Sequence, residues 1–207
     1  MTPSLRRELW VCAAVLPLLV WSVIGPYEYG TWLLEVAPVF IGFSLIFVTA
    51  RRFPLSTLLL VLIGLHSYVL IVGGHYSYAR VPLGEWAQDW FGWERNNYDK
   101  LGHFWQGFMP AILTREILLR RSPLRRGKWL NFLIVSVCLA FSACFEMLEW
   151  LVALALGGAD NFLGTQGYVW DTQSDMAWAG MGAFVALALL RRAHDRSMER
   201  LQSLTVA

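Results

Sequence analysis

Six long apolar runs constrain the fold of this chain more than any other feature. A helix needs about 17–25 mostly apolar residues to cross the ~30 Å hydrocarbon core of a bilayer. The runs cover residues 9–24, 32–50, 54–73, 99–119, 129–156 and 175–190, of which the first and last are short. Because the runs are apolar on all sides rather than along one stripe, they differ from the helices of a soluble domain.

The composition supports a membrane protein. Of the 207 residues, 57% are hydrophobic and 15% are charged, whereas soluble domains carry about 25% charged residues. The sequence therefore predicts an all-α polytopic protein, in which residues 1–207 form a single integral membrane domain with a bundle of six transmembrane helices. The three cysteines lie inside the runs without a paired motif, so we expect neither a disulfide framework nor a zinc cluster. The oligomeric state stays open.

Basic residues are divided unequally between the two sets of run ends. One set is flanked by Arg6, Arg7, Arg51, Arg52, Arg120, Arg121, Arg125, Arg126, Lys128, Arg191, Arg192, Arg196 and Arg200, and the other by Arg80, Arg95 and Lys100. By the positive-inside rule, the N and C termini are cytoplasmic, and the segments 25–31, 74–98 and 157–174 face outward. Short basic loops between spans determine topology and contact anionic membrane lipid, so no nucleic-acid partner is expected.

The outward segment after the third run is rich in aromatic residues. Residues 73–78 read Gly-Gly-His-Tyr-Ser-Tyr, which predicts a helix end at the glycines and an interfacial position for the tyrosines. In residues 83–93, three tryptophans recur at helical spacing on one face. This pattern predicts a short interfacial helix in the outer headgroup region, which either covers a site or serves as a plain anchor.

The fourth run begins with a polar stripe. Asp99, His103 and Gln106 follow one another at steps of four and three, so they share one face of a helix. Ionisable side chains are costly in lipid, so this face is expected to meet protein, water, a ligand or a metal. Near the other end of the run, Glu116 and Arg120 have the spacing of a structural ion pair.

The fifth and sixth runs add two pairs of acids at the same level of the membrane. Glu146 and Glu149 are three residues apart and share a face, and Asp171 and Asp175 stand at the start of the sixth run. Carboxylates in hydrocarbon need a proton, a basic side chain or a cation. Capping and the helix dipole explain one of the two aspartates easily, but both less well.

Topology therefore gathers several ionisable side chains on the outer side of the membrane. Imidazole with carboxylates suits Zn²⁺, Mn²⁺ or Fe, whereas carboxylates alone suit Mg²⁺ or Ca²⁺. The candidate ligands of a divalent metal ion are His75, Asp99, His103, Glu146, Glu149, Asp171 and Asp175. The candidate catalytic groups are Asp99, Lys100, His103, Glu146 and Glu149, with a glutamate as general base and Lys100 stabilising negative charge.

Two other interpretations stay open. The same residues can serve as helix–helix contacts in a non-catalytic membrane scaffold. Ion or proton translocation would need a polar path to the cytoplasm, for which the fourth to sixth runs offer little beyond Thr114, Arg115 and Glu116. The two halves of the chain do not repeat each other, which disfavours an inverted-repeat transporter. The sequence does not decide whether the protein is an enzyme.

Four stretches together resemble the YjdF-like family of bacterial inner-membrane proteins. They are residues 95–104 (RNNYDKLGHF), 114–116 (TRE), 145–150 (FEMLEW) and 164–176 (GTQGYVWDTQSDM). The resemblance covers nearly the whole chain and implies a multi-pass protein of the inner (cytoplasmic) membrane. It implies no established reaction.

A looser resemblance is to VanZ-like proteins. It rests on Asp99, Lys100, His103 and Phe104, followed by acids at Glu146 or Glu149 and at Asp171 or Asp175, while the intervening sequence departs from the pattern. VanZ-like proteins are linked to glycopeptide resistance at the cell envelope. This resemblance implies that the site binds, or acts on, a membrane lipid or a lipid-linked envelope molecule.

Overall fold

The computed structural model describes residues 3–156 and 166–206, which are helical throughout apart from turns and short connections. The helices are α1 (Pro3–Ser22), α2 (Tyr29–Thr49), α3 (Thr57–Tyr76), the short 3-10 helix η1 (Tyr78–Arg80), α4 (Pro82–Phe91), α5 (Tyr98–Arg121), α6 (Lys128–Leu156) and α8 (Asp171–Val206). No strand occurs in these residues. Part of the predicted 157–174 loop, residues 157–165, lies outside the described residues.

A helix covers each of the six apolar runs, which confirms the all-α class. Four of these helices, α2, α3, α6 and α8, are long and apolar enough to cross a membrane, judged by length and composition. Helices α1 and α5 are not among them. Helix α1 begins with the charged residues Arg6, Arg7 and Glu8, and α5 contains Asp99, Lys100, Arg115 and Glu116 among its buried residues.

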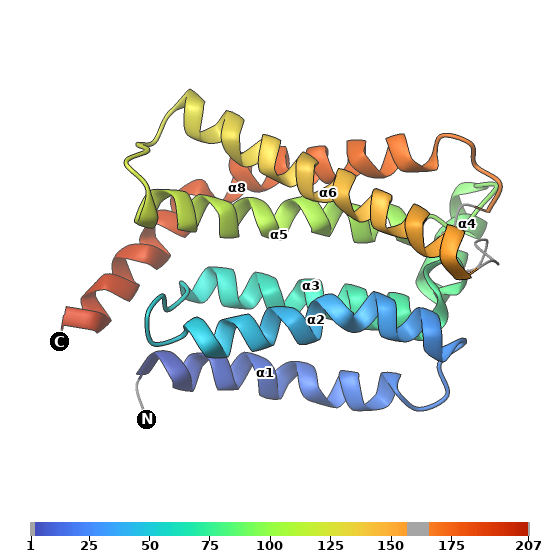
Figure 1. Ribbon diagram of the computed structural model, residues 1–207, viewed down its shortest axis with the longest axis horizontal. Coiled ribbons are helices and arrows are strands. Elements are labelled where there is room, and N and C mark those ends of the chain that lie inside the picture. The colour runs from blue at the N-terminus through green and yellow to red at the C-terminus, as the bar shows by residue number, and fades with distance from the viewer. Residues whose placement is uncertain (1–2, 157–165, 207) are drawn as a thin grey trace.

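Helix α5 lies in the middle of the molecule (Figure 1). It packs against α6 and α8 on one side and against α3 on the other, while α1 and α2 contact α3. The bundle therefore consists of an α1–α2–α3 group and an α5–α6–α8 group, joined through contacts of α3 with α5 and α8. This arrangement places Asp99, Lys100, Arg115 and Glu116 of α5 in the interior of the bundle.

Glycines allow α5 and α8 to approach with their backbones in contact. A Cβ added to Gly107 would overlap the carbonyl oxygen of Ala179, and one added to Gly182 would overlap that of Phe104. Small residues at an interface let transmembrane helices pack closely. The close approach brings side chains at the start of α5 within reach of those at the start of α8.

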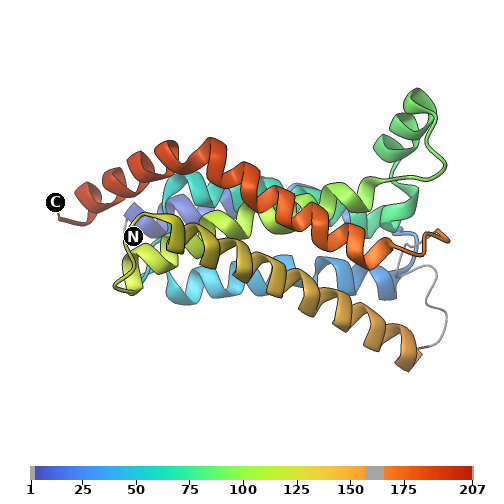
Figure 2. The same ribbon diagram turned by 90° about the horizontal axis from the view of Figure 1, so that it is seen from above.

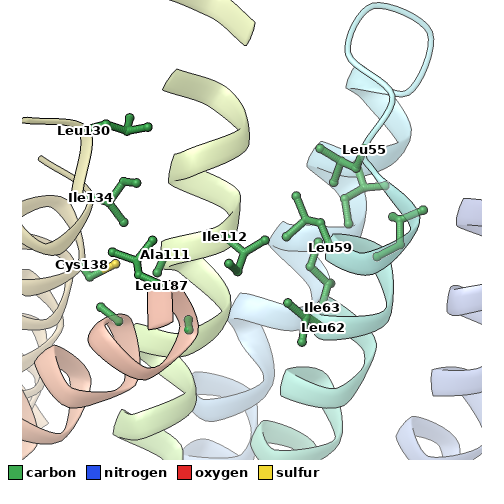
Figure 3. Packing of buried hydrophobic residues seen from close by; sticks show 14 residues of the cluster. Leu55, Leu59, Leu62, Ile63, Ala111, Ile112, Leu130, Ile134, Cys138 and Leu187 are labelled. Carbon is green, nitrogen blue, oxygen red and sulfur yellow. The ribbon is translucent and has the colours of Figure 1, made fainter. Parts of the chain in front are cut away.

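An apolar core fills the bundle away from its ends. Ile112 of α5, Leu59 of α3, Ile134 of α6 and Leu187 of α8 are buried members of this core. In Figure 3, Ile112 faces Leu59 on one side of α5, and Ile134 and Leu187 lie on the other side of this helix. The core separates the polar residues at one end of the bundle from those at the other.

Two local expectations differ from the structure. The glycine pair at 73–74 does not end α3, which continues to Tyr76. The turn comes at Ser77, which adopts a left-handed conformation with φ of 59°. This turn carries the Tyr78 ring against Gly73 and Gly102, where added Cβ atoms would overlap it, so Tyr78 packs inward instead of in an aromatic belt.

Helix α8 is longer than its predicted span of 175–190. Its 36 residues correspond to about 54 Å, well beyond the ~30 Å of a hydrocarbon core. Its C-terminal part extends past the end of the bundle (Figure 1). Ser197 in this part accepts a hydrogen bond from the Leu58 amide at 3.0 Å, which connects the extension to the start of α3.

Candidate functional site

The starts of α5 and α8 form one wall of the candidate site. The Asn96 side chain caps the chain just before α5 by accepting a hydrogen bond from the Tyr98 amide at 3.0 Å. Asp99 lies in the first turn of α5, and Asp171 lies in the first turn of α8. Acidic side chains are stabilised at helix N-termini by the exposed amides and the helix dipole. The N-termini of α5 and α8 thus favour the aspartates in their first turns.

Lys100 lies among three aspartates. Its Nζ is 2.6 Å from Asp171, 2.7 Å from Asp175 and 3.3 Å from Asp99. The ammonium group donates hydrogen bonds to Asp171 and Asp175, and Asp99 lies at ion-pair distance. Lys100 is therefore the cation that this group of three aspartates surrounds.

Arg95 closes the same group from the segment before α5. Its guanidinium contacts Asp99 and lies 2.8 Å from Asp171. Burial opposes the charged form, but the neighbouring Asp99 and Asp171 carboxylates raise the pKa of Arg95 above its ordinary value. Counted as ionised, three aspartates face two cations, which gives this group of five residues a formal charge of −1.

His103 lies one turn deeper along α5. Its Nδ1 is 3.0 Å from the side-chain oxygen of Gln106, and its Nε2 is 3.7 Å from Asp175. An amide oxygen only accepts hydrogen bonds, so Nδ1 donates in this contact, and Nε2 faces the Asp175 carboxylate. This confirms the predicted shared face of Asp99, His103 and Gln106.

Glu146 of α6 faces the same histidine. Its Oε1 is 3.7 Å from His103 Nδ1 and has no hydrogen-bond partner, although the residue is only 8% exposed. Its carboxylate accepts a hydrogen bond from the Thr172 side chain. A buried carboxylate oxygen without a partner is energetically costly. It marks a position where a proton, a cation or another ligand can bind.

Two sets of side chains have the spacing of metal ligands. One ligand atom from each of His103, Glu146 and Asp175 lies within 4.8 Å of the others, and the same holds for Asp99, Asp171 and Asp175. In the aspartate set, Lys100 already supplies the positive charge. We define the metal-candidate triad as His103, Glu146 and Asp175.

Glu149 and His75 differ in their relation to this site. Glu149 lies near enough to Glu146, Asp175 and Glu35 of α2 for their charges to interact. His75 lies elsewhere, because its Nδ1 is 3.0 Å from the Ser22 carbonyl oxygen and its ring packs at a tilt against Trp21 of α1. The structure therefore does not bring His75 to the triad.

A second buried network lies at the other end of α5. Glu116 accepts hydrogen bonds from the Ser56 amide at 2.9 Å and from Arg120 at 2.6 Å, and it lies 2.9 Å from His194 Nε2. Arg115 donates to His194 Nδ1 at 2.8 Å. Arginine has no acceptor, so His194 is protonated on Nε2 and donates to Glu116. We call these residues the Glu116 network.

The sequence analysis missed several of these participants. Glu35 was visible as an acid within an otherwise apolar run, and Arg95 was visible in the stretch that precedes the polar stripe. The role of His194 had no local signal, because its partners are distant in the chain. The predicted pair Glu116–Arg120 is confirmed at 2.6 Å, as one contact within the larger network.

A bundle of long apolar helices with an ionic site buried at one end defines a multi-pass helical membrane protein. The chain belongs to the family described as "Predicted membrane protein (DUF2238)", whose model matches residues 7–196. It is similar to the inner membrane protein YjdF of Escherichia coli (strain K12), with 50% identity over 189 residues, 91% of this chain and 90% of that protein. No solved structure matches the chain. The YjdF-like resemblance and the inner-membrane location are thereby confirmed.

Proposed function

We propose that this protein crosses the inner membrane six times, with both termini in the cytoplasm and the metal-candidate triad facing outward. Helices α1 and α5 contain 20 and 24 residues, enough to cross a ~30 Å core. They lie alongside helices that meet the length and composition of a span (Figure 1). The end opposite the triad carries exposed Arg52, Arg126 and Arg192, as the positive-inside rule requires of a cytoplasmic face.

At this outward site, His103, Glu146 and Asp175 bind a divalent cation. The observation that carries this assignment is the buried, unpartnered Glu146 Oε1 beside His103 and Asp175. The residual negative charge of the aspartate group favours a cation over an anion. One imidazole and two carboxylates suit Zn²⁺, Mn²⁺ or Fe²⁺. Glu149, close to Glu146, is then the candidate general base.

The ligand class that fits this location is a membrane lipid or a lipid-linked envelope molecule. Helix α6, which contributes Glu146, exposes Phe141, Leu148 and Leu151 along its outer surface. Apolar surface of this kind faces acyl chains, so an amphiphile can approach the triad from the bilayer. The looser resemblance to VanZ-like proteins agrees with an envelope ligand.

Metal titration of the purified full-length protein tests the proposal. Calorimetry with Zn²⁺ and electron paramagnetic resonance with Mn²⁺ should detect one site per chain, and Glu146→Gln should weaken binding by ~10–100-fold. His75→Ala is the matched control, because it removes a histidine at the same end but outside the triad. Failure of both metals to bind, or equal affinity in Glu146→Gln, would overturn the metal assignment.

A non-catalytic scaffold is the second candidate function. The observation that favours it is the set of ion pairs between Lys100 of α5 and Asp171 and Asp175 of α8, which hold the two helices together. A scaffold predicts that triad substitutions lower thermal stability and cellular abundance together. A Glu146→Gln protein that stays stable and abundant but loses a growth phenotype would reject the scaffold. Translocation is disfavoured by the apolar core between the two polar ends (Figure 3).

A further inference from the structure

Helix α4 presents a broad apolar face to its surroundings. Leu83, Trp86, Trp90 and Phe91 are 55%, 59%, 81% and 66% exposed, respectively. At 3.6 residues per turn they fall on one arc, and the polar residues Glu85, Gln88 and Asp89 fall on the opposite arc. A helix with this division of side chains has one face suited to an apolar phase and one suited to water.

The orientation of α4 matches a membrane surface. Figure 2 shows α4 running across the long axis of the bundle and extending sideways from the end at which α5 and α8 begin. Spanning helices run along the membrane normal, so a helix perpendicular to them lies along the membrane plane. At this level the plane is the interface of headgroups and acyl chains, where tryptophan is enriched.

Asn96 fastens α4 to the bundle. Its Nδ2 donates to the Val81 carbonyl at 3.0 Å, and its side chain occupies the space where a Cβ of Gly84 would lie. Gln166 holds the Asn96 backbone from both sides, by accepting from its amide at 3.2 Å and donating to its carbonyl at 2.8 Å. The preceding residue is Arg95, which contacts Asp99 and Asp171.

We propose that α4 is an anchor in the outer-leaflet interface. We also propose that the Asn96 contacts with Val81 and Gly84 connect this anchor to Arg95, whose guanidinium contacts Asp99 and Asp171. Contact with lipid through Leu83, Trp86 and Trp90 then stabilises the Arg95 contacts with Asp99 and Asp171. Insertion of α4 into lipid does not depend on cation binding at the triad. Only the assignment of α4 to the outer leaflet rests on the membrane orientation that we propose for the protein.

The lipid that α4 contacts is zwitterionic. The helix carries Glu85 and Asp89 and no lysine or arginine, so its charges offer no attraction to anionic headgroups. Apolar burial of indole and leucine side chains supplies the binding free energy instead. A docking site for a water-soluble partner would leave this face in solvent whenever the partner is absent.

Depth measurements on nitroxide labels test the anchor in full-length protein reconstituted into phosphatidylcholine vesicles. The three native cysteines (Cys12, Cys138 and Cys144) are first replaced by serine or alanine. A label at Trp90 should be accessible to oxygen and lie ~5–10 Å inside the interface. A label at Asp89, the matched control on the opposite face, should be accessible to a water-soluble nickel chelate. Adding phosphatidylglycerol should not deepen the Trp90 label.

Three outcomes would overturn the proposal. Equal access of the nickel chelate to both labels would place α4 in water, free for a protein partner. A Trp90 label shielded from both reagents would indicate a contact with a second copy of the chain. Asn96→Ala should broaden the depth distribution at position 90, whereas Glu94→Ala at an exposed neighbour should not. An unchanged distribution in Asn96→Ala would reject the connection to Arg95.

Discussion

Two charged side chains at the same end of the bundle, Lys100 and Glu146, are both buried but differ in their polar partners. Lys100 is surrounded by three carboxylates and forms an ion pair with each of them. Glu146 has an oxygen that accepts no hydrogen bond. Removing one partner of a buried ion pair destabilises the fold, because the other charge stays buried without a partner. A buried polar atom without a hydrogen-bond partner already destabilises the fold as it stands. We therefore expect substitutions of these two residues to change stability in different directions.

Lys100→Met should lower the free energy of unfolding by about 3–5 kcal/mol, because it leaves buried aspartates without their cation. Glu146→Gln should leave it unchanged or raise it, because a neutral group replaces a carboxylate with one unpartnered oxygen. Thermal unfolding of the purified protein in detergent measures both. Adding Asp175→Asn to Lys100→Met should recover part of the loss. Equal losses for Lys100→Met and Glu146→Gln would contradict this contrast.

Among the helices, α5 supplies the largest number of residues to the two buried polar networks. Its first turns supply Asp99, Lys100 and His103, and its last turns supply Arg115 and Glu116. Both polar ends depend on the distance between α5 and α8, since Lys100 pairs with Asp175 and Glu116 pairs with His194. The glycines at this interface set that distance.

Gly107→Ala should destabilise the protein by about 1–3 kcal/mol or more, because its Cβ would overlap a backbone carbonyl that cannot move aside as a side chain can. Gly42→Ala in α2 is the control, since a Cβ there meets nothing within 4 Å. It should be neutral or stabilising by up to about 1 kcal/mol, because alanine favours helix. The unfolding midpoint and the yield of monodisperse protein measure both variants. A tolerated Gly107→Ala would show that the helices can separate without loss of the fold.

The same helices show how far sequence reasoning reaches. Periodic features were predictable: the helices, the shared face of Asp99 and His103, and the pair Glu116–Arg120, which follows from i, i+4 spacing alone. Contacts between distant segments were not, because spacing does not show which helices are neighbours. His194 and Glu116 are far apart in the chain, and nothing local predicts that Lys100 would lie among three aspartates. The turn at Ser77 was missed because serine rarely adopts a left-handed conformation.

At the scale of the whole molecule, two polar ends are separated by an apolar middle. The triad lies at one end, the Glu116 network lies at the other, and Ile112, Leu59 and Leu187 fill the core between them. In the part of the chain that the structure describes, the C-terminal extension of α8 connects the Glu116 end to the start of α3. The two ends therefore belong to different compartments if the bundle spans the membrane.

Cysteine labelling tests this arrangement in living cells. In protein without native cysteines, a single cysteine replaces either Glu94, exposed near the triad end, or Arg125, exposed near the other end. Six spans with cytoplasmic termini predict that a membrane-impermeant maleimide applied to spheroplasts labels position 94 and not 125. Inside-out vesicles should reverse the pattern, because the basic residues that fix orientation lie at the 125 end. Labelling of position 125 in intact spheroplasts would invert the topology and place the triad in the cytoplasm, where an envelope ligand could not reach it from outside.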